Sequence, residues 1–241
     1  LGFVLFVPEA DSRHLRFDDR LTVGRFLRSL TFSPRRHPQF AWVWAGRFLF
    51  FFGLSLTVAY GTYFYSQRLG VPIAQVATVM AAVSAVGIAS AALGALGGGW
   101  VSDRWGSRRG WVAASTVVIA TGCPLSVFSW TLPMLITGAL ITNLGIRAFG
   151  SVGQALVLDV LPERETQAGR YLAITSFSQR VPSALAPLVA PLLLAAAGSM
   201  HQQYTVLYLA SAALALLGGA VTFAARRSRP QRPNKEAVPT P

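Results

Sequence analysis

Six long apolar segments dominate the sequence, and each is long enough to cross a lipid bilayer as a helix. A spanning helix needs about 20 predominantly apolar residues, and its backbone must satisfy its own polar groups inside hydrocarbon. Transmembrane strands would instead alternate polar and apolar residues, and these segments do not. We therefore predict an all-α integral membrane domain over residues 39–225. Its six spans are expected at about 40–65, 73–101, 111–130, 132–157, 171–197 and 204–225.

Composition and charge agree with a membrane protein. Of 241 residues, 53% are hydrophobic and 12% are charged, whereas a soluble domain carries about 25% charged residues. The net charge of +12 does not indicate a nucleic-acid partner, because the basic residues lie in short segments between apolar runs. The single cysteine, Cys123, excludes a disulfide within the chain.

The distribution of Lys and Arg predicts the orientation of the spans. Seventeen of the 21 Lys and Arg residues lie in segments on one side of the predicted spans, and Arg68 alone lies in a loop on the other side. Basic loops stay in the cytoplasm. We therefore predict a multi-pass protein of the cell membrane, with both ends of this sequence in the cytoplasm.

The segments outside the spans complete the predicted organisation. Residues 1–7 are apolar but too short for a secretory signal, and they lack its basic start and cleavage site. We expect them to be the end of a preceding transmembrane helix, which makes this chain the C-terminal part of a longer protein. Residues 8–38 are predicted to form a charged cytoplasmic linker. Residues 226–241, which include four prolines, are predicted to form a disordered cytoplasmic tail.

The loop between the second and third spans has the pattern G-x-x-x-D-R-x-G-x-R-R. Its residues are Gly99, Asp103, Arg104, Gly106, Arg108 and Arg109. The glycines permit a tight turn and close packing, the carboxylate can cap a helix or accept hydrogen bonds from arginine, and the arginines hold the loop at the membrane surface. The motif resembles the loop signature of the major facilitator superfamily, which joins the second and third, and the eighth and ninth, helices of those proteins.

This resemblance implies both a fold and a function. The fold is half of a twelve-helix carrier, with six transmembrane helices arranged as two inverted three-helix repeats. The implied partner is the missing N-terminal six-helix half of the same protein, to which the charged loop is expected to latch on the cytoplasmic side. The implied function is secondary active transport of a small polar solute across the lipid bilayer by alternating access.

Polar side chains inside the fourth and fifth spans are candidates for the substrate cavity. An ionisable group in a membrane helix is costly unless it faces protein or water. Asn143, Arg147 and Gln154 share one face of the fourth span, and Gln179 and Arg180 share one face of the fifth. We expect Arg147 and Arg180 to line a central cavity; the alternative is that either one snorkels or supports packing.

Two other features of the spans bear on the mechanism. Tyr60 in the first span is a further cavity candidate, because its ring and hydroxyl suit a sugar-like solute, although tyrosines also collect at membrane interfaces. Pro182, Pro187 and Pro191 are expected to break the fifth helix.

Several chemistries have no residues to support them. No Asp or Glu lies within the hydrocarbon portion of a span, so a proton-coupled carrier would hold its proton-binding residue in the missing half. The sequence contains no metal-ligand cluster, no nucleophile–base arrangement and no phosphate-binding glycine loop. We therefore predict that the protein is not an enzyme and has no catalytic residue, cofactor or metal site.

A second resemblance concerns the solute. Gln154-Ala-Leu156 and Asp159-Val-Leu-Pro162 are similar to segments of glycoside–pentoside–hexuronide and sucrose symporters, which implies proton-coupled sugar transport. Arg147 departs from that pattern, since those carriers tend to have an aromatic or small residue there, and an arginine equally suits an anionic solute. The alternatives are a drug-type efflux carrier and a non-transporting membrane scaffold or sensor subunit.

Overall fold

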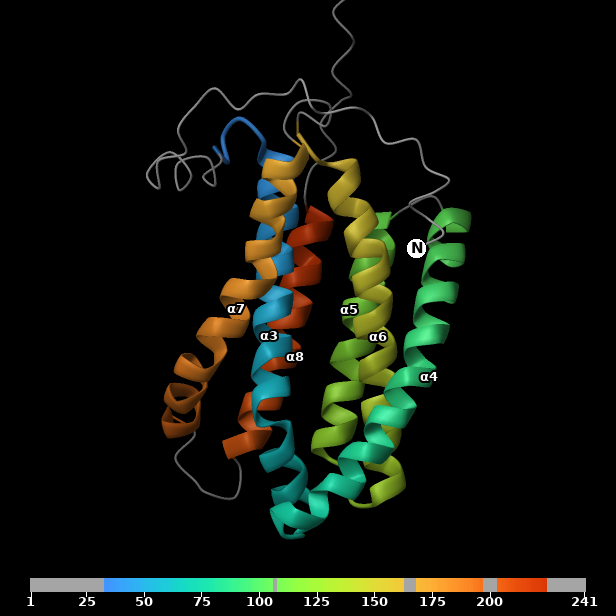
Figure 1. Ribbon diagram of the computed structural model, residues 1–241, viewed down its shortest axis with the longest axis vertical. Coiled ribbons are helices and arrows are strands. Elements are labelled where there is room, and N and C mark those ends of the chain that lie inside the picture. Colours follow the sequence, from blue (N-terminus) through green and yellow to red (C-terminus); the bar gives the residue numbers. More distant parts are fainter. Residues whose placement is uncertain (1–32, 106–107, 163–167, 197–202, 225–241) are drawn as a thin grey trace, which may run out of the picture. The chain divides into compact units, whose positions relative to one another are not determined.

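The computed structural model describes residues 33–105, 108–162, 168–196 and 203–224, and in most of the segment 94–105 it describes the backbone alone. These residues form six α-helices and no strand (Figure 1). The all-α prediction is confirmed, since each predicted span is a helix. The segment 1–7, the tail 226–241 and all but the last residues of the linker 8–38 lie outside the described residues. The helices are α3 Pro38–Leu69, α4 Ile73–Trp105, α5 Arg108–Val127, α6 Leu132–Asp159, α7 Ala168–Ala196 and α8 Gln203–Ala224.

Local sequence explains where these helices begin and end. Pro38 lies in the first turn of α3, where its missing N–H costs no hydrogen bond. The same helix ends at Gly70, whose φ of 64° is the left-handed conformation that glycine adopts without strain. At the start of α6 the hydroxyl of Thr131 accepts a hydrogen bond of 3.4 Å from the backbone N–H of Met134, which caps the helix.

The prolines of α7 do not break it, so that expectation was wrong. The helix continues from Ala168 to Ala196 with Pro182, Pro187 and Pro191 inside. Each proline removes only one backbone hydrogen bond, and in membrane helices neighbouring groups and local adjustments satisfy the freed carbonyl. Helix α5 likewise contains Pro124.

Five of the six helices are long and apolar enough to cross a membrane. They are α3, α5, α6, α8 and the Ile73–Leu93 part of α4. Helix α7 has sufficient length but carries Gln179 and Arg180 together with several hydroxyl side chains. Its polar face therefore requires protein or water beside it rather than lipid.

The helices pack as two similar groups of three. Helix α3 packs against α8 and α7, helix α6 packs against α5 and α4, and the contact between α5 and α8 joins the groups (Figure 1). Exchanging α3 with α6, α4 with α7 and α5 with α8 reproduces this set of contacts. The first repeat is therefore α3–α5 and the second is α6–α8, as expected for inverted three-helix repeats.

Small residues at matching positions create close contacts between α3 and α8 and between α5 and α6. A Cβ placed on Gly46 of α3 would lie 2.6 Å from the carbonyl oxygen of Gly218 on α8. A Cβ on Gly138 of α6 would lie 3.1 Å from the carbonyl oxygen of Gly122 on α5. Each of these contacts joins a helix of one repeat to a helix of the other, and in both the backbones approach at glycine, as small residues allow in membrane helices.

A second pair of matching glycine contacts lies two helical turns further along α3 and α6. Gly53 follows Gly46 by seven residues and faces the carbonyl oxygen of Ser211, 2.6 Å from a Cβ. Gly145 follows Gly138 by seven residues and faces the carbonyl oxygen of Ser115, 2.9 Å from a Cβ. The two repeats therefore share a packing pattern, although the sequences around these glycines differ.

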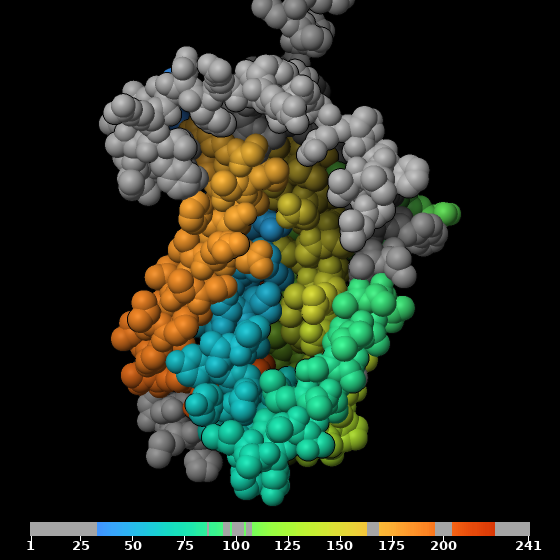
Figure 2. Space-filling view, viewed as in Figure 1, coloured from blue at the N-terminus to red at the C-terminus, as the bar shows by residue number. Residues whose placement is uncertain are grey.

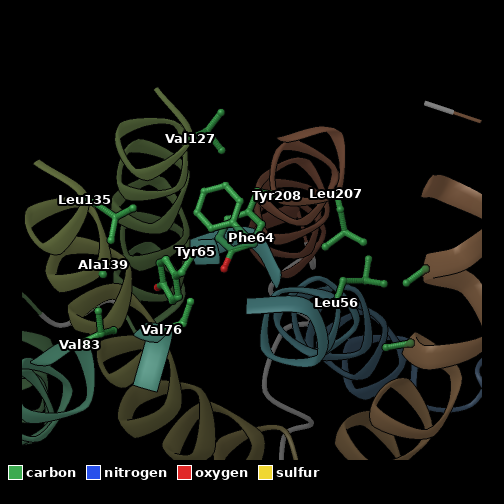
Figure 3. Packing of buried hydrophobic residues seen from close by; sticks show 12 residues of the cluster. Leu56, Phe64, Tyr65, Val76, Val83, Val127, Leu135, Ala139, Leu207 and Tyr208 are labelled. Carbon is green, nitrogen blue, oxygen red and sulfur yellow. The ribbon is translucent and has the colours of Figure 1, made fainter. Parts of the chain in front are cut away.

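A cluster of buried apolar residues lies where the second half of α3 meets the other five helices. The rings of Phe64 and Tyr208 stack with centroids 3.9 Å apart, and Leu56 and Leu207 are fully buried beside them. Figure 3 shows these side chains with Tyr65 pointing toward the middle of the group. This cluster fixes the position of α3 against the second repeat and forms one wall of the cavity described below.

Candidate functional site

A cavity of about 580 Å³ opens between α3, α4 and α6. Figure 2 shows it as a hollow bounded by the blue to teal α3, the green α4 and the yellow α6. Most of its lining is apolar, as expected within a membrane domain, but several polar side chains project into it. The polar groups that matter here are Thr57, Tyr65, Ser84, Asn143, Arg147 and Tyr208.

Helix α6 supplies the amide and the cation of this cavity. Asn143 and Arg147 are four residues apart and both line it. The amide of Asn143 donates through Nδ2 to the carbonyl oxygen of Ala139 at 2.9 Å. Its Oδ1 faces Gly87 of α4, 3.6 Å from a Cβ placed there. Arg147 is exposed, so its guanidinium is available to a solute.

Two tyrosines lie on the buried side of the same cavity. Tyr65 comes from the end of α3 and Tyr208 from α8, and only 8% and 4% of their surfaces are exposed. Sequence reasoning included neither Tyr65 nor Tyr208 among the cavity candidates. No local signal could have found Tyr208, because its place at the cavity depends on the contact between α8 and α3, which are far apart in the sequence.

Tyr60 does not line this cavity. Its ring packs with those of Tyr63 and Tyr204 at centroid distances of 6.3 Å each, and Tyr63 stacks on Tyr204 at 6.1 Å. The three rings join the end of α3 to the start of α8. In the described half, Tyr60 therefore supports helix packing.

Gln179 and Arg180 lie in a separate place on α7. Together with Ser176 and Ser183 they line an open hollow formed by this helix. Ser183 is tied to α3, because its hydroxyl lies 3.2 Å from that of Ser55. Arg147 and Arg180 thus line two different hollows of this half, and both side chains are exposed.

Gln154 lies two turns beyond Arg147 on α6 and contacts a buried arginine. Nη2 of Arg47, from α3, donates to its Oε1 at 3.4 Å. Only 6% of Arg47 is exposed, and its guanidinium lies 5.2 Å from the ring centre of Phe51. Sequence reasoning placed Arg47 inside a span but did not include it in the site. Its position in an apolar helix was the available signal.

The charged loop forms an ion pair within this half. Nη1 of Arg108, at the start of α5, lies 2.8 Å from both carboxylate oxygens of Asp159, at the end of α6. Arg104 is exposed at the end of α4, and Arg109 is half-buried. Gly106 lies outside the described residues, and the structure describes only the backbone of Gly99 and Asp103, within α4.

Comparison with known proteins identifies the family. The model of the Major Facilitator Superfamily matches residues 88–241, which is well over half of the chain. No curated protein matches the sequence. The matched region contains the charged loop, helices α5 to α8 and the three polar residues that α6 contributes to the cavity, Thr142, Asn143 and Arg147. This chain therefore belongs to the Major Facilitator Superfamily, whose members are transmembrane transporters rather than enzymes.

Proposed function

We propose that this protein moves a small polar solute by secondary active transport with alternating access, and that the solute contacts Asn143 and Arg147. The observation that carries this proposal is the cavity between α3, α4 and α6. Its volume of about 580 Å³ suits a small molecule. A few polar groups in an otherwise apolar wall are the arrangement that orients such a ligand.

Exposed polar residues support the presence of a second half. Arg147 and Gln154 on α6, and Gln179 and Arg180 on α7, are all exposed in this half. Lipid is an unfavourable environment for such side chains, whereas a polar cavity between two halves satisfies them. We therefore propose an N-terminal six-helix half of the same protein as the partner that covers these faces.

We also propose that both ends of this sequence face the cytoplasm of a cell membrane. The support is the distribution of Lys and Arg in the sequence. Among those outside the predicted spans, Arg68 alone falls on the opposite side, and it lies in the last turn of α3. Arg68 donates from Nε to the carbonyl oxygen of Ser129 at 2.8 Å and lies against the ring of Trp130. These contacts hold Arg68, the arginine that we propose lies outside the cytoplasmic side, against the protein surface.

The cavity lining supports a sugar-like ring that carries a polar or charged group. The rings and hydroxyls of Tyr65 and Tyr208 suit the face of a sugar, and the guanidinium of Arg147 suits an anionic substituent. We propose proton coupling through a residue of the other half, because no carboxylate is among the residues that line this cavity.

Drug-type efflux is the second candidate, and the apolar part of the same wall favours it. Val58 and Met80 line the cavity together with several leucine, isoleucine and valine residues. Such a wall accepts an amphipathic compound, and methionine adapts to different shapes. A carrier of this kind would retain activity without the charge of Arg147, whereas transport of an anionic solute would not.

The experiment is solute uptake by the full-length protein reconstituted in proteoliposomes. Neutral sugars, sugar acids and an amphipathic cation are offered with and without an inward proton gradient. We expect uptake of a polar solute that falls about tenfold or more in Asn143→Ala and in Arg147→Gln, because each removes a hydrogen-bonding group from the site.

Matched controls separate the cavity from general effects. Arg36→Gln removes a charge of the same kind at an exposed position before α3, and Thr137→Ala removes a polar group from an exposed position of α6. Both should transport at the wild-type rate. Unchanged uptake in Asn143→Ala and Arg147→Gln would contradict the proposed site, and no uptake of any solute would favour a scaffold or sensor.

A further inference from the structure

Arg47 is a buried cation with free hydrogen-bond donors. It lies nine residues into α3, and 6% of its surface is exposed. Nη2 reaches Oε1 of Gln154 only at 3.4 Å, and among the described residues Nε and Nη1 have no hydrogen-bond partner. A buried arginine with two unpartnered nitrogens is strongly unfavourable, because the group cannot lose its charge.

The described side chains offer no counter-charge to Arg47. Asp159 is the carboxylate that they include, and it binds Arg108 in an ion pair of 2.8 Å. The Arg47 guanidinium instead contacts the amide of Gln154 and lies over the ring of Phe51. A ring face attracts the cation but does not use its N–H donors in the plane.

Helix α6 covers the unpartnered nitrogen at a glycine. A Cβ placed on Gly153 would lie 3.3 Å from Nη1 of Arg47, and Nη1 and Nε are both enclosed. The adjacent Gln154, whose Oε1 accepts from Nη2, is exposed. A ligand on the exposed face of α6 therefore reaches the donors of Arg47 where the Gln154 side chain moves aside.

The same face of α6 leads to the cavity. Arg147 precedes Gln154 by seven residues, which is two helical turns or about 10 Å along the axis. Leu54 of α3, which lines the cavity, follows Arg47 by the same spacing. The two arginines thus lie about two helical turns apart along the contact between α3 and α6, and Arg147 is the one beside the cavity.

We propose that Arg47 and Gln154 form an oxyanion site that binds a carboxylate or phosphate group of the transported solute. The inference rests on the proposed transport function and makes the solute an organic or inorganic anion. Arg147 binds the oxyanion in the cavity, and Arg47 binds it about two helical turns away along α3 and α6. The planar donors of a guanidinium match the paired oxygens of both groups.

Direct binding to the purified full-length protein tests the site. The probes are radiolabelled inorganic phosphate and acetate, measured by scintillation proximity in detergent at low ionic strength. The two probes distinguish a phosphate from a carboxylate ligand. We expect saturable binding of at least one probe, weakened about tenfold or more in Arg47→Gln through loss of charged hydrogen bonds.

Two further variants keep the test valid if Arg47→Gln does not fold. Arg47→Lys keeps the charge but loses the planar pair of donors, so it should bind the probe more weakly than wild type and more tightly than Arg47→Gln. Gly153→Ala places a methyl group beside Nη1 and should also weaken binding. Arg36→Gln, an exposed charge removal before α3, should bind as wild type.

The outcomes separate this site from the transport function. Equal probe affinity in wild type, Arg47→Lys and Gly153→Ala overturns the site, as does the absence of saturable binding. In that case uptake of a neutral sugar by the same preparation would leave transport standing. If the probe binds in a way that depends on Arg47 but the protein transports no solute, the anion site is supported and the proposed transport function is contradicted.

Discussion

Arg108 and Asp159 join the start of α5 to the end of α6 through an ion pair in which one nitrogen lies 2.8 Å from both carboxylate oxygens. The two residues are 51 positions apart in the sequence. The pair belongs to the charged loop on one side and to the end of the cavity-lining helix on the other. The ion pair therefore ties the loop to the end of α6.

Asp159→Asn should affect transport more than stability. Both side chains of the pair are more than a third exposed, and exposed ion pairs stabilise proteins by about 1 kcal/mol or less. We expect a free-energy change of unfolding within that limit, but slower uptake because the loop loses its contact with α6. The charge-reversed double variant Arg108→Asp with Asp159→Arg should recover uptake. A double variant that transports no faster than either single variant would contradict this.

Gly46→Ala should destabilise the contact between α3 and α8. Its Cβ would lie 2.6 Å from a backbone oxygen of Gly218, so the helices must separate. Such overpacking costs about 1–3 kcal/mol, which a lower thermal unfolding midpoint in detergent would report. Gly150→Ala on α6 is the matched control, since a Cβ there meets no atom within 4 Å. Equal midpoints for the two variants would contradict the close contact.

Trp44→Phe should lose the hydrogen bond that ties α3 to α7. The indole Nε1 donates to the carbonyl oxygen of Ile174 at 2.9 Å. Loss of one such bond lowers the free energy of unfolding by about 1 kcal/mol, which denaturation in detergent can measure. Trp42→Phe removes an indole from the same helix at a position that is 49% exposed and should change little. A larger effect at Trp42 would argue against this packing.

Cysteine labelling should distinguish the cavity from the core. Cys123 is 3% exposed and should resist a hydrophilic maleimide until the protein unfolds. In a Cys123→Ala background, Ser84→Cys should react in the folded protein, because Ser84 is exposed and lines the cavity. Ser178→Cys, at a fully buried position of α7, should not react. Similar rates at both positions would contradict an open cavity.

The sequence predicted the helices because their signals are local. An apolar segment of sufficient length forms a helix in a bilayer whatever surrounds it. Helical spacing also indicated that Asn143 and Arg147 share a face, and both line the cavity. The loop motif indicated the family, because its six residues have the spacing of that family's loop signature. None of these inferences requires knowledge of which helices are neighbours.

Only the tertiary structure decided which of these faces meet. Arg47 and Gln154 are 107 positions apart, and the glycine contacts between α3 and α8 bring together residues that are further apart still. Periodicity gives the direction of a side chain about its own helix but not the helix that it faces. For this reason the sequence could not show that Arg147 and Arg180 line separate hollows among these six helices, and it left Arg47 out. The sequence determined six helices and their polar faces; close packing of small residues between the helices decided the cavity and the cation buried beside it.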